Sequence, residues 1–428
     1  MVRSLRVVAL GLISNKEKQH SALGSQAIKP YRGFQCDESR VLMHELLTDP
    51  AQFAHYFERY ACSLVSILGW GRRIGSLDDS ILKTAVKMMH DITLVQVPAL
   101  YWLDTFPALQ HLPKWFYPLP AQFRSLGKSL KRFWWALSCE GAERETPNFS
   151  HALIKTAEGN GLSQAEIGEM TATLIGGGLD TTSSTLHTLV LALCLFPEVL
   201  KRAHDELDRV VGNTAPSWDD LDGGRLPYCA AVLKEAMRWR SVTALGGFAH
   251  APIQDDIYKG YHFPAGIPIF GNVWAMHANP VDFPHPHDFR PERYLDQRQP
   301  YPNKIGHSAF GWGRRSCSGQ YFAEQSLSQT VARLLWSFDI RPGLDEHVRK
   351  SRKQLNSSVL TNDEKGNPVK LDPWAYTDNE NTQPLPFKAQ FIARNEEIKA
   401  HICREAEEGR ERLRIYDGET KVTLDQFM

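Results

Sequence analysis

The sequence predicts a mainly α-helical protein with a minor β portion, and three observations support this fold class. Apolar residues recur at helical spacing from Val41 to Ile74 and again from Asp78 to Val97. A capping box at Ser163–Glu166 and a stop signal at Pro197 bracket one helix of roughly 50 Å, long enough to cross a domain. The stretch 244–266 instead alternates apolar residues with glycine and proline, which is typical of short strands and hairpins.

Length and composition favour one large globular domain. Of the 428 residues, 42% are hydrophobic and 10% aromatic, which is enough for a sizeable core and excludes disorder as the main state. Lysine plus arginine and aspartate plus glutamate each number 49, so no overall field draws in nucleic acid. We therefore expect no nucleic-acid partner.

The cysteines and the first residues indicate the compartment. Seven cysteines, an odd number, are widely scattered and form no CxxC pair, which fits a reducing environment and argues against a disulfide framework or a zinc knuckle. The apolar piece from Leu5 to Ile13 is too short for a membrane span and does not read as a signal peptide. We expect no transmembrane helix.

One loop, Phe310 to Gly319, carries the strongest chemical signal. Cys317 stands where this loop enters a helix-prone run that begins at Gln320 and continues to about Trp336. The positive end of a helix dipole favours the thiolate form, which is the form that binds metal. A lone cysteine is more often a small buried apolar residue, so the case depends on its neighbours.

Those neighbours point to a planar cofactor. Gly313 and Gly319 would let the backbone turn tightly and pass close to a flat ligand. Arg315 can offer its forked cation to a carboxylate. A planar ligand that has carboxylates and a metal bound by a soft ligand is haem.

The middle of the long helix is also unusual. Gly176, Gly177 and Gly178 precede Asp180 and Thr181, which places helix-weakening and polar residues where a buried helix should be apolar. The helical hydrogen-bond ladder can open at such a point, since threonine hydroxyls bond back to earlier carbonyls. Glycine packing against a neighbouring helix is the alternative. A phosphate-binding loop is excluded because no Gly-Lys-Ser or Gly-Lys-Thr follows.

Five residues of the loop match the haem loop of the cytochrome P450 family: Phe310, Gly313, Arg315, Cys317 and Gly319. The chain resembles this family from about His20 to Ala393. The resemblance implies a cytochrome P450 fold that lacks the N-terminal anchor and the first sheet region, so we expect a chain truncated relative to the family. The implied organisation is a divergent N-terminus (1–19), a haem-thiolate monooxygenase domain (20–393) and a charged C-terminal tail (394–428). We expect the tail, helix-like from Glu396 to Arg414, to be solvated.

The resemblance also assigns roles around the cofactor. It implies that Cys317 is the proximal ligand of haem b, that Arg315 meets a haem propionate and that Phe310 packs near the sulfur. It further implies that His250 donates to a propionate, and the alternative is a solvent-facing histidine. The His285-x-His287 pair reads as surface rather than metal site, because no further ligand sits at metal spacing.

On the other side of the cofactor, Gly177 to Thr182 resembles the oxygen-binding groove of the family. The resemblance implies that Thr181 hydrogen-bonds dioxygen and that Asp180 helps to relay protons toward it. A hydroxyl and a carboxyl group that exchange with water suit this task.

A structural clamp is the last set of site residues. Glu235 and Arg238 share one helical face, and Arg293 lies in a segment that resembles the one completing a buried ion triad with them. Such a triad is costly to leave half made, so we expect loss of any member to prevent haem incorporation.

The implied activity is insertion of one oxygen atom from dioxygen into an apolar organic substrate, as in fungal members that tailor secondary metabolites. Electrons would come from an NADPH-dependent flavoprotein reductase, docking near Cys317 where Lys304, Arg314 and Arg315 supply positive charge. Two alternatives stay open: a non-catalytic or degenerate haem binder, and a haem-dependent isomerase or dehydratase, against which Asp180 and Thr181 count.

The family resemblance places the protein at the surface of the endoplasmic reticulum. A peripheral membrane contact through Trp102, Trp115 and Phe116 is one hypothesis for the aromatic, proline-rich stretch 101–118. The alternative is that these aromatics form the core of a loop-rich segment.

Overall fold

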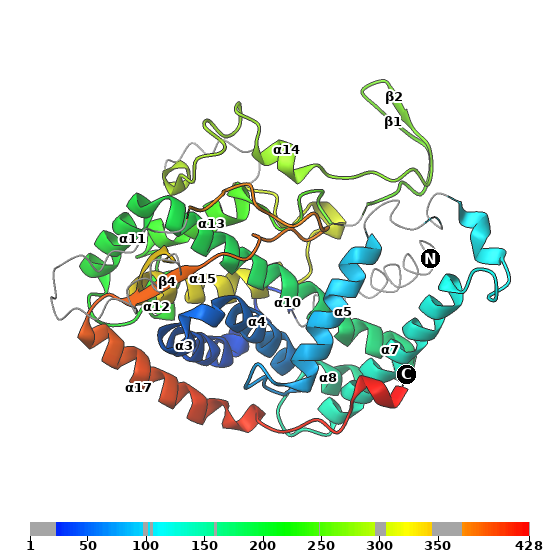
Figure 1. Cartoon of the computed structure of the whole chain (residues 1–428), viewed down its shortest axis with the longest axis horizontal. Helices are drawn as coiled ribbons and strands as arrows, with labels where there is room; N and C mark the ends of the chain where they lie inside the picture. The colour runs from blue at the N-terminus through cyan, green and yellow to red at the C-terminus, as the bar shows by residue number, and fades with distance from the viewer. Residues whose placement is uncertain are drawn as a thin grey trace, which may run out of the picture.

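The computed structural model is mainly helical, with two small antiparallel sheets, as the sequence predicts (Figure 1). It describes residues 23–96, 102, 106–157, 161–247, 249–295, 305–344 and 370–427.

The longer helices are listed here in chain order: α3 (Arg32–Thr48), α4 (Phe53–Trp70), α5 (Ser80–Gln96), α7 (Leu119–Ala142), α8 (Phe149–Lys155), α10 (Gln164–Leu195), α11 (Pro197–Val210), α13 (Pro227–Trp239), α15 (Gln320–Ser337) and α17 (Glu396–Leu413). Two one-turn helices are α12 (Trp218–Asp222) and α14 (Val273–His277). The strands pair as β1 (Asp256–Tyr258) with β2 (Tyr261–Phe263) and β3 (Phe338–Pro342) with β4 (Ala389–Ala393).

Helix α10 crosses the molecule and packs against α4 and α7 (Figure 1). Its start is set by the predicted capping box, since Ser163 accepts from the N–H of Glu166 and Glu166 accepts from the N–H of Ser163. Its end is set by Pro197, which begins α11. The helix is continuous from Gln164 to Leu195, so the expected opening at the glycines is not seen.

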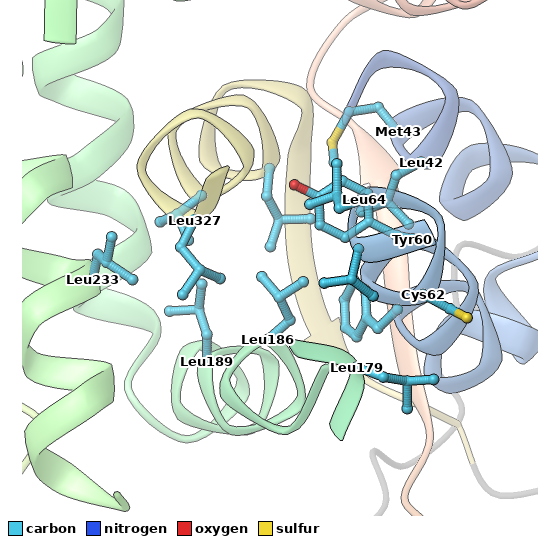
Figure 2. Packing of buried hydrophobic residues seen from close by; sticks show 14 of the residues in the cluster. Leu42, Met43, Tyr60, Cys62, Leu64, Leu179, Leu186, Leu189, Leu233 and Leu327 are labelled. Atoms are coloured by element: carbon cyan, nitrogen blue, oxygen red, sulfur yellow. The ribbon is translucent and has the colours of Figure 1, made fainter. Parts of the chain in front are cut away.

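The core lies where α10 meets α4, α13 and α15 (Figure 2). Leu186 and Leu189 of α10 point toward Leu327 of α15, and all three side chains are buried. Burial of a leucine side chain stabilises a fold by about 1.5–3 kcal/mol. The C-terminal half of the helix that carries the polar stretch is therefore packed into the core.

The expectation of a solvated C-terminal tail is wrong. Helix α17 packs along α3, with Ile398, Ile402, Ala406 and Leu413 buried on one face. These apolar residues are few, but most are spaced four apart, so they form one stripe among charged neighbours. The domain boundary at residue 393 stays a prediction.

The aromatic side chains before α7 are exposed, so the alternative of a loop-rich core is wrong for them. Trp102 is 72% exposed, Trp115 83% and Phe116 67%. Among the described helices, no single one is both long and apolar enough to cross a bilayer. The pair α10 and α11 would pass by length and composition together, but it is bent by 101°.

Strands β1 and β2 form the predicted hairpin in the stretch 244–266 and project from the body of the molecule (Figure 1). Lys259 and Gly260 make its two-residue turn with φ values of 50° and 82°, as hairpin turns of this length require.

Candidate functional site

The Cys317 loop is closed by backbone hydrogen bonds. The N–H of Cys317 donates to the carbonyl of Phe310 at 2.7 Å, and the N–H of Ser316 donates to Gly313 at 3.1 Å. Helix α15 begins at Gln320, as predicted. These bonds fix the exposed Cys317 two residues before the cap of a helix N-terminus.

Two glycines of this loop have the left-handed conformation that favours glycine. Gly313 has φ 60°, as expected, and the second is Gly311, with φ 71°. Gly319 has φ −87°, so its conformation does not require glycine. A Cβ at Gly319 would lie 3.9 Å from the sulfur of Cys317, which is ordinary contact. Gly311 lies within the same loop, from Phe310 to Gly319, but its position in the sequence did not indicate its left-handed backbone.

Arg315 and His250 are both exposed, and the charge of Arg315 acts on the His250 ring. Partial burial and the Arg315 cation together lower the pKa of His250. The backbone of His250 pairs with Ile269 through bonds of 2.9 and 2.7 Å, which fixes the backbone at this position. Both side chains can donate to carboxylates, and their contacts with haem propionates stay predictions.

The segment of α10 from Gly177 to Thr182, which resembles the oxygen-binding groove, has an open face at Gly177 and a packed face at Gly178. The Thr181 hydroxyl donates to the carbonyl of Gly177 at 2.6 Å, and a Cβ at Gly177 would meet no atom within 4 Å. A Cβ at Gly178 would collide with Val65 of α4. Gly178 thus serves helix packing, the alternative weighed from the sequence, whereas Gly177 leaves space beside Thr181.

Asp180 is largely buried and hydrogen-bonded. Its carboxylate accepts a bond of 2.8 Å from the amide of Asn381. Burial raises the pKa of Asp180, the Asn381 donor opposes this, and the charge of Glu58 adds to the rise. Sequence reasoning did not identify Asn381, since no motif marks it.

The structure brings Glu235, Arg238 and Arg293 together. Arg238 donates two bonds of 2.8 Å to the two oxygens of Glu235, and Arg293 donates one of 3.1 Å. The side chains of Glu235, Arg238 and Arg293 are 0%, 1% and 8% exposed. A buried, bidentate pair of this kind is strongly specified by geometry; its role in haem incorporation stays a prediction.

A chain of hydrogen bonds leads from this triad to the Cys317 loop. Arg238 donates to the carbonyl of His277 at 3.0 Å, the N–H of Ser308 donates to the His277 ring at 2.8 Å, and the indole of Trp312 donates to the Ser308 hydroxyl at 3.1 Å. Burial, with the charges of His307 and Arg238, lowers the pKa of His277 to about 3. The ring is therefore neutral and able to accept. Sequence reasoning missed His277 and Ser308.

The residues present fit a haem. The exposed thiol of Cys317 would bind the metal, Arg315 and His250 would donate to the propionates, and Gly177 leaves space beside Thr181. No group of three or more histidine, cysteine, aspartate or glutamate residues within the described ranges is arranged to hold a metal ion instead. Lys304, one of the expected cations near the loop, lies outside the described residues, while Arg314 and Arg315 are exposed.

Comparison with known proteins gives consistent results. The family model described as Cytochrome P450 matches residues 17–369. Cytochrome P450 monooxygenase drtD of Aspergillus calidoustus is 32% identical over 395 residues, covering 90% of this chain and 69% of that protein. Cytochrome P450 monooxygenase 58 of Postia placenta is 32% identical over 340 residues, covering 74% of this chain and 62% of that protein. The chain thus spans roughly two thirds of the length of these relatives.

Among solved structures, the haem domain of cytochrome P450DA has a TM-score of 0.65 at 19% identity, covering 87% of this chain and 75% of that one. This likeness supports the fold.

Proposed function

Because the chain belongs to the cytochrome P450 family, we propose that it is a haem-thiolate monooxygenase that acts on an apolar organic substrate. One atom of dioxygen enters the substrate, and the other leaves as water with two electrons and two protons supplied from outside. The observation that carries the proposal is the exposure of Cys317 just before the N-terminus of α15. The backbone N–H of Cys317 donates to the carbonyl of Phe310 and so closes the loop that presents the thiol.

The chain's own residues divide the work. Cys317 would hold the metal of haem b, and Arg315 and His250 would hold its propionates. The haem supplies oxygen activation, since a thiolate ligand donates electron density that favours O–O cleavage. Thr181 and Asp180 would contribute a hydroxyl and a carboxyl group for proton delivery to the bound oxygen.

The electron donor we propose is an NADPH-dependent flavoprotein reductase. The exposed Arg314 and Arg315 next to Cys317 support docking of an acidic partner on this face. The reductase is a separate protein in this proposal.

A tailoring step in secondary metabolism is our proposal for the pathway class. It rests on the likeness of the motifs to fungal members and on the fungal source of the relatives named above. For localisation we propose a peripheral contact with the surface of the endoplasmic reticulum. The exposed Trp102, Trp115 and Phe116 support this contact, since aromatic rings favour the membrane interface.

The decisive test is the spectrum of the reduced, carbon monoxide-bound protein. A red-shifted Soret band is expected for the parent, and Cys317→Ser should lose it. An ordinary band in the parent would contradict thiolate ligation.

Product formation then separates monooxygenase from the two alternatives. We expect product only with NADPH and reductase present. Product from a peroxide without reductase would favour the isomerase or dehydratase. A red-shifted band with no turnover of any apolar compound would favour the non-catalytic haem binder.

A further inference from the structure

The carboxylate of Asp180 is held by a residue far away in the sequence. Asn381 lies 201 residues later, and its side-chain Nδ2 donates to Asp180 Oδ2 at 2.8 Å. Asp180 is mostly buried, and this neutral donor orients its carboxylate.

Asn381 belongs to the segment of residues 376–384, which contacts α10 and is here termed the strap. Side chains of the strap meet α10 at successive helical turns, since residues 180, 184 and 188 are spaced four apart on one face. The contacts are Asp180 with Asn381 at 2.8 Å, Ser184 with Gln383 at 3.4 Å and Thr188 with Tyr376 at 3.4 Å.

The strap is anchored on its other side by backbone bonds. The N–H of Thr382 donates to Val242 at 2.7 Å, and Asn381 forms an isolated β-bridge with Thr243. Within the strap, the N–H of Thr377 donates to Gln383 at 2.9 Å. The side chain of Asn381 therefore reaches Asp180 from a fixed backbone, and these anchors do not depend on its amide.

The surroundings of Asp180 favour its neutral form, and Asn381 opposes them. Burial raises the pKa of Asp180, and Glu58 of α4 adds to the rise. His55 lies beside Glu58 at 3.1 Å, and Glu380, next to Asn381, has a pKa raised by its own burial. A neutral amide stabilises the carboxylate without the full ion pair that an arginine would form, so a proton can still bind and leave.

We propose that Asn381 is a positioning residue for Asp180, whose amide fixes the carboxylate of the proton relay and keeps it able to take one proton from solvent and release one proton onward. The relay role of Asp180 rests on the function proposed above. The contact between Asn381 and Asp180 is independent of it.

The test titrates Asp180 directly in the haem-loaded protein. Carboxyl carbons are labelled through ¹³C-aspartate, and NMR spectra are recorded in the ferrous, carbon monoxide-bound form, which is diamagnetic. Asp180→Asn identifies the Asp180 signal. Asn381→Ala is expected to shift its titration midpoint to higher pH, and Asn381→Asp to shift it further, because two carboxyl groups then share the site.

Ser184→Ala is the matched control, since it removes the neighbouring contact of the strap but leaves the amide on Asp180. Its Asp180 midpoint should stay at the parent value. If the Asp180 midpoint stays at the parent value in Asn381→Ala and also in Asn381→Asp, the proposal is wrong. A shift of equal size in Ser184→Ala would also overturn it, because the strap as a whole would then set the titration of Asp180.

Turnover supplies a second readout. With reductase, Asn381→Ala is expected to form about tenfold less product per NADPH consumed, since a misplaced proton relay diverts oxygen reduction from product. If the midpoint shifts but the parent itself forms no product, the proposed function fails and the positioning role of Asn381 stands.

Discussion

Two buried glutamates, Glu235 and Glu38, each hold two arginines, yet they serve different parts of the molecule. Glu235 of α13 binds Arg238 and Arg293, and Glu38 of α3 binds Arg59 at 2.8 Å and Arg73 at 2.7 Å. Both glutamate side chains are fully buried.

The two clusters differ in the residues that their arginines contact beyond the glutamate. The Glu235 cluster continues through His277 toward the Cys317 loop. The Glu38 cluster joins α3 and α4, and the N–H of Arg73 donates to Tyr416 near the C-terminus at 2.8 Å. The comparison teaches that similar chemistry supports a cofactor loop in one place and the assembly of chain ends in another.

The largest effect should come from removing either glutamate. Glu38→Ala and Glu235→Ala each leave arginines buried without their counter-charge, which costs about 3–5 kcal/mol of unfolding free energy. Urea unfolding measures this loss. Haem content of the folded fraction should fall in Glu235→Ala and hold in Glu38→Ala. Equal haem content in the two variants would remove the distinction.

Arginine geometry is the next test. Arg293→Lys and Arg73→Lys keep the charge but lose the fork that reaches the glutamate, so we expect each to cost about 1.5–3 kcal/mol. The reduced, carbon monoxide-bound spectrum should lose part of its red-shifted band only in Arg293→Lys. A matching change in Arg73→Lys would argue for general destabilisation as the cause.

The link from the Glu235 cluster to the loop depends on His277. His277→Leu removes the acceptor for the Ser308 N–H and should cost about 1–3 kcal/mol, with loss of the red-shifted band. His277→Gln offers a carbonyl oxygen and is the control that should retain more of both. If the leucine variant keeps the full band, the chain of bonds does not position the loop.

Acid should lower the stability that the Glu38 cluster contributes to the fold. Burial works to raise the pKa of Glu38, but Arg59 and Arg73 outweigh it, so the pKa lies below its ordinary value of 4.5. The stability that follows is present above pH 4.5 and is lost as pH falls through the lower, folded-state value.

Glu38→Gln tests this sign, because it lacks the titrating group. Urea midpoints measured against pH should fall less steeply below pH 4.5 in this variant than in the parent. Parallel curves would mean that other carboxylates govern the acid response.

Local patterns made the helices and the Cys317 loop predictable. The capping box at Ser163 and the stop at Pro197 are signals within a few residues of the feature they set, and α10 follows them. The same holds for the hairpin turn at Gly260. The family membership and the mainly helical fold followed from such signals.

Long-range partners could not be predicted in this way. Asn381, His277 and Glu38 bear no local motif, and their partners are fixed only when distant segments pack. Helix α17 was misjudged because its buried isoleucines are diluted by charged residues, so its mean apolar content is low. The approach of Gly319 to a flat cofactor stays a prediction, since its backbone angle of φ −87° does not test it.

The projecting hairpin offers an experimental handle. Its strand residues are mostly exposed, so the turn at Lys259–Gly260 can be cut or lengthened at little cost to the core. Trypsin should nick the native chain after Lys259, and an epitope or new chain termini should be tolerated there, which gives a way to immobilise the molecule through an exposed turn.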